Sequence, residues 1–159
     1  LRRLIILFEP MIMQSAMLSN PSRTALTLAS LLLYLSGPAH AFCFDAAGRE
    51  FGVDSRLLWA IAKVESGFDP QAIGPDGKDL GLMQVRTIHI DDLRSRFGVQ
   101  ITRQDLFDPC FNVRMGAWVL ATKIQRYGPT WEAVGSYNAR SRDKRDIYIR
   151  KVWVAYRSS

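Results

Sequence analysis

Residues 54–67 read DSRLLWAIAKVESG, and this stretch decides the helical character of the chain. Asp54 or Ser55 can cap a helix over residues 56–66, and Gly67 is a typical residue to end it. Apolar side chains recur within it at the spacing of one helix face, at Leu58, Ile61 and Ala62. The stretch therefore predicts a helix that packs this face against a core.

Glu65 continues the apolar face of this helix. It follows Leu58 by seven residues and Ile61 by four, so its carboxyl group should point toward the core side. Burial there would raise the pKa of the carboxyl group, and the helix dipole in the last turn acts in the same direction. A proton held near neutral pH suits a general acid. The alternative is a structural glutamate that pairs with an arginine at the rim.

The rest of the chain up to its C-terminus also favours helices. Asn112 is predicted to cap a long helix that Gly128 ends, and residues 81–86 are predicted to form a short helical piece. Residues 68–79 are rich in Gly, Pro and Asp and are predicted to form a loop. Further helices are expected over 44–51, 88–97, 131–137 and 146–156, with a turn at 106–110. We expect a mainly α fold of short helices around a cleft, without a confident strand.

The first residues have the features of an export signal. Residues 25–35 form an apolar run that is short for a membrane span, and Ala39-His40-Ala41 has the form of a signal peptidase site. We therefore expect an upstream extension over 1–16, a signal peptide over 17–41 and one domain over 42–159. A retained membrane anchor is the alternative.

Composition indicates the charge of the binding partner and excludes some kinds of catalytic site. The chain has 159 residues, of which 48% are apolar, and a formal net charge of +6, which suits an anionic partner. Cell wall, nucleic acid and acidic lipid all qualify, but no nucleic-acid recognition motif is present. Cys43 and Cys110 would form one disulfide in an exported chain. His89 is the only histidine after residue 41, which argues against a metal site and against a Ser-His-Asp mechanism.

Three ordered motifs resemble those of the lysozyme-like lytic transglycosylases. They are Glu65-Ser66-Gly67-Phe68-Asp69-Pro70, Gly81-Leu82-Met83-Gln84 and Ser136-Tyr137-Asn138-Ala139. The likeness extends over residues 42–154 and is greatest to the small members that accompany type III secretion systems, type IV pili and conjugation machines. It implies a lysozyme-like fold, a periplasmic enzyme without a cofactor, and peptidoglycan as the substrate.

The resemblance also implies a mechanism with one essential carboxyl group. Protonated Glu65 would donate to the glycosidic oxygen between N-acetylmuramic acid and N-acetylglucosamine. As a carboxylate it would then take the proton of the muramoyl 6-hydroxyl, whose oxygen closes onto C1. The product is a 1,6-anhydromuramoyl end, and no water is consumed.

The motif positions imply roles for further residues. Ser66 would orient Glu65, while Met83 and Gln84 would line the cleft beside the scissile bond. Tyr137 and Asn138 would come from the opposite wall, with the Tyr137 hydroxyl bonded to Glu65. Ser66 could instead be structural, and Tyr137 could instead pack in the core.

Asp79 and Arg140 lie just outside the three motifs. Asp79 could stabilise the oxocarbenium-like transition state as a second carboxylate, or it could simply turn the chain before Gly81. Arg140 stands where the family usually has glycine, so a left-handed backbone there would be strained.

Two other functions stay open at this point. One is a hydrolytic muramidase on the same fold, in which Asp79 helps water to attack. The other is a wall-binding assembly factor of a secretion, pilus or conjugation apparatus, in which cleavage is vestigial. The leading expectation is a transglycosylase that locally opens the wall for such an apparatus.

Overall fold

A computed structural model describes residues 43–98 and 100–159 of the chain. The predicted extension over 1–16 and signal peptide over 17–41 lie outside the described residues. Within those residues, none of the helices combines the length and the apolar character needed to cross a membrane.

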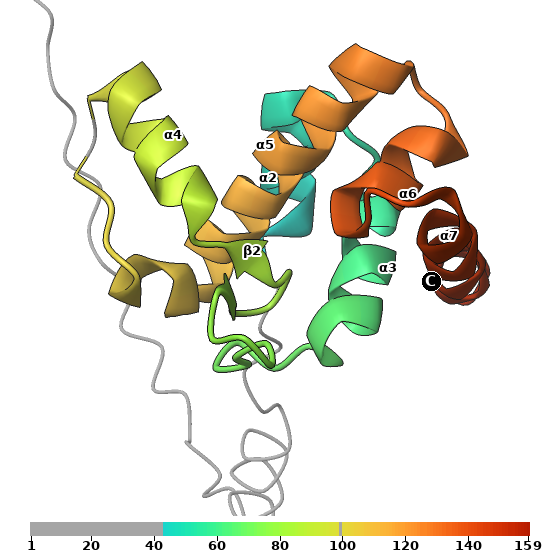
Figure 1. Ribbon diagram of the computed structural model, residues 1–159, viewed down its shortest axis with the longest axis horizontal. Coiled ribbons are helices and arrows are strands. Elements are labelled where there is room, and N and C mark those ends of the chain that lie inside the picture. Colours follow the sequence, from blue (N-terminus) through green and yellow to red (C-terminus); the bar gives the residue numbers. More distant parts are fainter. Residues whose placement is uncertain (1–42, 99) are drawn as a thin grey trace, which may run out of the picture. The chain divides into compact units, whose positions relative to one another are not determined.

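The described part is built almost wholly from helices, which confirms the predicted fold class (Figure 1). Its elements, in chain order, are α2 (Phe44–Phe51), α3 (Ser55–Ser66), β1 (Asp79–Leu80), β2 (Val85–Arg86), α4 (Ile88–Phe97), the 3-10 helix η1 (Gln104–Phe107), α5 (Pro109–Tyr127), α6 (Trp131–Asn138) and α7 (Arg142–Arg157).

Local capping signals set the bounds of α3 as predicted. The Asp54 side chain accepts a hydrogen bond from the backbone N–H of Arg56 at 2.9 Å. Gly67 has a φ of 63° and ends the helix in the left-handed conformation that glycine adopts without strain.

Three predicted elements differ from the structure. Residues 81–84 form a turn, and β2 pairs antiparallel with β1 in register Asp79 to Arg86, so the predicted helical piece over 81–86 is wrong. The long helix begins at Pro109 with Asp108 as its cap, and the side chain of Asp108 accepts from the N–H of Phe111 at 2.7 Å. The last helix begins at Arg142, four residues before the predicted start, and the charged residues 142–144 are exposed in its first turn.

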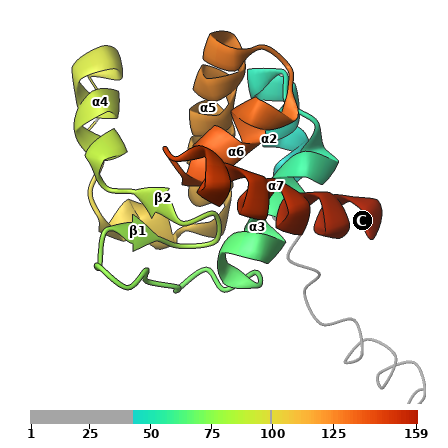
Figure 2. The same ribbon diagram turned by 45° about the vertical axis from the view of Figure 1, so that its right-hand side comes forward.

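α5 occupies the middle of the fold. Its buried face includes Val113, Ala117 and Leu120, each 0% exposed. α4, the two strands and η1 lie to one side of it, and α3, α6 and α7 lie to the other (Figures 1 and 2). The third motif, at the end of α6, is thereby placed opposite the hairpin formed by β1 and β2.

The side chain of Asn112 fastens the hairpin to α5. Asn112 is 0% exposed and lies inside α5, so the predicted capping role is wrong. Its amide nitrogen donates to the carbonyl oxygens of Leu80 at 2.8 Å and Leu106 at 2.7 Å, and its amide oxygen accepts from the N–H of Met83 at 2.7 Å. Gly81 lies so close that a Cβ atom would stand 2.4 Å from the Asn112 amide nitrogen.

A disulfide joins Cys43, which precedes α2, to Cys110 in the first turn of α5. The predicted pairing of the two cysteines is therefore present in the structure. It closes a loop with a sequence separation of 67 residues and holds α2 against α5.

Candidate active site

Glu65 is positioned by the packing of α3. Leu58 and Ile61, on the same face, are both 0% exposed and anchor the helix in the core. The last turn of α3 carries this face to the edge of the core, where the largely buried Glu65 carboxyl group lines a cleft. The Glu65 side chain thus points toward the core side of α3, as its helical spacing predicted.

The surroundings of Glu65 raise the pKa of its carboxyl group, so that the group keeps its proton to a higher pH. Desolvation by burial is the main cause that raises the pKa of Glu65 from 4.5 to about 7. Hydrogen bonds from the side chains of Tyr148 and Asn138 stabilise the charged form and lower the pKa, and the negative charge of Asp79 raises it. Since desolvation prevails, Glu65 exchanges its proton close to neutral pH, as a group that acts first as acid and then as base requires.

The cleft at Glu65 has two parts. Its larger part has a volume of about 680 Å³ and lies between the hairpin, α4 and the end of α6. A smaller part of about 230 Å³ lies against α7 and includes Lys144 and Lys151. Glu65 and Asn138 line both parts, so the candidate acid lies where the two parts adjoin.

Asp79 lines the larger part of the cleft, where an ion pair orients it. Arg86 donates from one guanidinium nitrogen to both carboxylate oxygens of Asp79, at 2.8 and 3.1 Å. The other terminal nitrogen of Arg86 donates to Asp76 at 2.7 Å. The register of the two strands produces this contact, because Asp79 and Arg86 are directly paired.

Ser66 and Met83 lie near the site but have other contacts than predicted. The Ser66 hydroxyl donates to the carbonyl oxygen of Leu82 at 2.7 Å, so it fastens the end of α3 to the turn at 81–84. The Met83 side chain is 0% exposed and packs against Gly116, which corrects the expectation that it lines the cleft.

Gln84 does line the cleft, but its amide nitrogen is occupied. It donates to the carbonyl oxygens of Gly81 at 2.9 Å and Ala72 at 3.2 Å and so holds the turn together. The φ of Gln84 is 47°, a left-handed value that residues other than glycine rarely adopt. The turn thus keeps a strained residue beside the candidate acid.

The hydroxyl bonded to Glu65 belongs to Tyr148 and not to Tyr137. Tyr148 on α7 donates to Glu65 Oε1 at 2.6 Å. Tyr137 lines the cleft beside Asn138, but its hydroxyl donates to the carbonyl oxygen of Met83 at 3.0 Å. Sequence analysis missed Tyr148, although its spacing of four and seven residues from the buried Val152 and Ala155 indicates that it points inward.

Two further residues complete the wall near α4 and α6. Arg140 lines the cleft, and its φ is not positive, so the expected backbone strain is absent. His89 also lines the cleft, and burial lowers its pKa, which keeps the imidazole neutral at pH 7. Among the residues that the structure describes, no group of three or more His, Cys, Asp or Glu side chains could hold a metal ion.

Comparison with known proteins agrees with this geometry. Residues 42–151 match the family model described as the Transglycosylase SLT domain. The invasion protein IagB of Salmonella typhimurium is 44% identical over 126 residues, which cover 75% of this chain and 78% of the relative. Protein IpgF of Shigella flexneri is 35% identical over 141 residues, which cover 80% of this chain and 91% of the relative.

A solved structure has a similar fold. It is an inactive mutant of the lytic transglycosylase Slt from Pseudomonas aeruginosa, with a TM-score of 0.63 and 23% sequence identity. The match covers 74% of this chain but only 23% of the Slt chain, so the likeness concerns the fold of one part of that larger protein.

Proposed function

The chain belongs to the transglycosylase SLT domain family and is a peptidoglycan lytic transglycosylase, and from this premise we propose that Glu65 performs both proton transfers of the reaction. The observation that carries the proposal is the placement of a carboxyl group with a pKa of about 7 where the two parts of the cleft adjoin. A glycan strand that occupies both parts would pass its glycosidic bonds over Glu65.

The proton balance of the reaction needs one group only. Glu65 gives its proton to the glycosidic oxygen, which leaves as the hydroxyl of N-acetylglucosamine as the bond to C1 breaks. The carboxylate then accepts the proton of the muramoyl 6-hydroxyl, and that oxygen forms the new bond to C1. Glu65 ends protonated, so it is ready for the next cycle.

Tyr148 and Asn138 support the second half of this cycle. Both hydrogen-bond the charged form of Glu65, and so they stabilise the carboxylate that exists between the two proton transfers. Tyr137 and Ser66 act indirectly, because each fixes the backbone of the turn at 81–84, which places Gln84 in the wall of the cleft.

We further propose that Asp79 stabilises positive charge that develops at C1. Its carboxylate lines the cleft, and the ion pair with Arg86 holds it in one orientation. Asp79→Asn should lower kcat by at least about tenfold and change stability by less than about 1 kcal/mol, because the ion pair is partly exposed. Kinetics on glycan strands and urea unfolding measure the two effects. Unchanged turnover would leave Asp79 with a structural role only.

Product analysis tests the function itself. Sacculi digested with the wild-type protein should release muropeptides with 1,6-anhydromuramoyl ends by mass spectrometry, and Glu65→Gln should release none. Glu50→Gln is a matched control, because Glu50 is an exposed residue paired with Arg114. Reducing ends in place of anhydro ends would identify a hydrolase, and normal release by Glu65→Gln would refute the assignment of the acid.

The substrate implies a location outside the cytoplasm, in the periplasm or beyond it. We propose export through the signal peptide predicted over 17–41, and a task in opening the wall for a secretion, pilus or conjugation apparatus. Similarity to a protein named for invasion supports this task. Assembly of the apparatus should fail in cells that carry Glu65→Gln, whereas a wall-binding factor with vestigial cleavage would still support it.

A further inference from the structure

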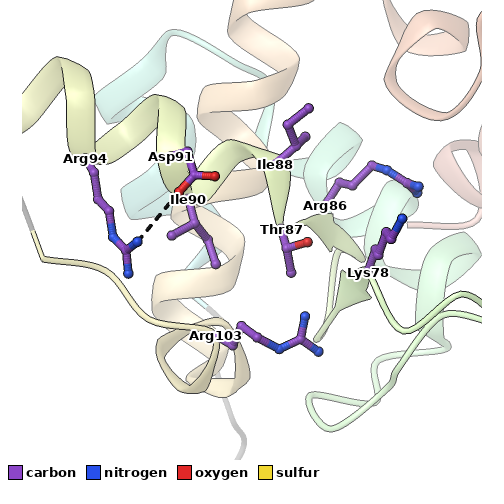
Figure 3. A pocket seen from close by; sticks show the side chains of 8 residues that line it. All are labelled: Lys78, Arg86, Thr87, Ile88, Ile90, Asp91, Arg94 and Arg103. Atoms are coloured by element: carbon purple, nitrogen blue, oxygen red, sulfur yellow. Dashed lines mark ion pairs between the residues drawn. The ribbon is translucent and has the colours of Figure 1, made fainter.

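A second cavity opens beside the cleft at the hairpin. It has a volume of about 620 Å³ and lies between α4, the hairpin and the residue that precedes η1 (Figure 3). Arg86 and Ile88 line both this cavity and the larger part of the cleft, so the two hollows adjoin. We call it the basic pocket, after its four cationic residues Lys78, Arg86, Arg94 and Arg103.

The charges of the basic pocket are not fully balanced. Asp91 is the one acidic residue in its lining and lies 3.6 Å from Arg94, while Arg86 is paired with Asp76 and Asp79. Within the described ranges, neither Lys78 nor Arg103 takes part in a salt bridge. One Arg103 nitrogen donates to the carbonyl oxygen of Gly77 at 2.9 Å, which orients the guanidinium group.

The pocket also has an apolar wall. Ile88 is 61% exposed at the boundary with the cleft, and the buried Ile90 contributes to the lining from the same helix. Arg94 extends from α4 toward the segment before η1, and Arg103 extends from that segment toward the hairpin, while Lys78 and Arg86 extend together from the hairpin on the side away from Arg94 (Figure 3). This arrangement suits a ligand that combines carboxylates with short aliphatic groups.

We propose that the basic pocket binds the carboxylates of the peptide stem that a muramoyl residue carries, while the glycan lies in the adjoining cleft. This inference rests on the proposed function, because only a bound glycan strand brings a stem peptide to this place. Stem peptides are short, carry several free carboxylates and contain alanine, so they match both the charge and the apolar wall. The pocket would then favour strands that still bear peptides over strands stripped of them.

Two substrates test the preference. Lys78→Gln combined with Arg103→Gln should lower kcat/KM on peptide-bearing glycan strands by about tenfold, at a few-fold for each exposed cation. On strands stripped of peptides by an amidase, the loss should be less than about twofold. The matched control is Arg150→Gln with Arg157→Gln, which removes the same charge from the exposed surface of α7 and should leave both rates unchanged.

A binding measurement separates this inference from the proposed function. A free stem tripeptide, titrated by NMR, should shift resonances of α4 and the hairpin in the wild type and in Glu65→Gln, and binding should weaken about tenfold in the double variant. If Arg103→Gln disturbs the loop at Gly77, the single variant Lys78→Gln replaces the double variant in both measurements. Among the described residues, the Lys78 side chain makes no hydrogen bond that this change would remove. Equal losses on both substrates, or a tripeptide that does not bind, would overturn the inference. Tripeptide binding without any anhydro product would instead contradict the proposed function.

Discussion

At Glu65, effects of opposite sign act on one carboxyl group. Desolvation raises its pKa, and hydrogen bonds from Tyr148 and Asn138 lower it again, with about 7 as the result. In an unfolded chain the same group would have a pKa near 4.5. The folded protein therefore binds this proton more tightly than the unfolded protein, so stability is lost as pH rises between these two values.

Glu65→Gln should for this reason stabilise the protein at alkaline pH. At about pH 8 the variant should gain up to about 3 kcal/mol in free energy of unfolding, because it avoids an ionised group at a desolvated site. At about pH 5 the gain should fall below about 1 kcal/mol, since the wild-type residue is then mostly protonated. Urea unfolding at both pH values, with Glu50→Gln as the control, measures the difference. A gain in stability that does not depend on pH would show that ionisation of Glu65 is not its cause.

Tyr148→Phe should move the pH dependence of catalysis. Without the donor at 2.6 Å the carboxylate loses stabilisation, so the pKa of Glu65 should rise above about 7 and the alkaline limb of kcat/KM should shift to higher pH. Tyr156→Phe is the matched control, because the Tyr156 hydroxyl donates to Asp54 at 2.6 Å, away from the cleft. An alkaline limb that stays in place, or moves to lower pH, would exclude this role of Tyr148.

Between elements, side-chain to backbone hydrogen bonds hold the two walls of the cleft together. Ser66 joins α3 to the turn at 81–84, Tyr137 joins α6 to the same turn, and Asn112 joins α5 to it. The strands β1 and β2 have two residues each and could not hold this position alone. The turn therefore depends on its contacts with three helices.

Asn112→Ala tests this dependence. The change leaves two buried carbonyl groups and one N–H without their partner, and should lower the free energy of unfolding by at least about 3 kcal/mol. Chemical denaturation gives the value. Asn138→Ala should cost less than about 1 kcal/mol, because Asn138 is exposed at the end of α6, even if activity falls. Similar costs for the two variants would show that Asn112 does not fasten the hairpin.

Across the whole described domain, one disulfide joins the first described residue to the middle of the domain. The Cys43–Cys110 disulfide closes a loop with a sequence separation of 67 residues. In the chain-entropy model, a loop of this length contributes about 4 kcal/mol to stability. The link places α2 against α5, and it needs the oxidising conditions that prevail outside the cytoplasm.

Cys43→Ser with Cys110→Ser should accordingly lose about 4 kcal/mol and unfold at a clearly lower temperature. Calorimetry of the wild type with and without a thiol reductant measures the same effect by a second route. The reductant should have no further effect on the double variant. A wild-type protein whose Tm is insensitive to reduction would refute the contribution of the disulfide.

Much of the helical framework follows from the sequence alone. The bounds of α2 and α4, the end of α3 at Gly67, the end of α5 at Gly128 and the inward direction of Glu65 were all predicted. Caps, glycine stops and helical spacing act over a few neighbouring residues, so they can be recognised in a single stretch. The motifs then predicted the family, which the comparison confirms.

Tertiary structure decided which side chains meet at the site. The bond from Tyr148 to Glu65 joins residues 83 positions apart, and the bonds of Asn112 reach back 32 and 29 positions to Leu80 and Met83. Strand pairing placed Arg86 on Asp79, and packing turned Met83 into the core. Such contacts depend on how the helices pack together, and periodicity within one helix sets only the face that turns inward, not the partner that it meets.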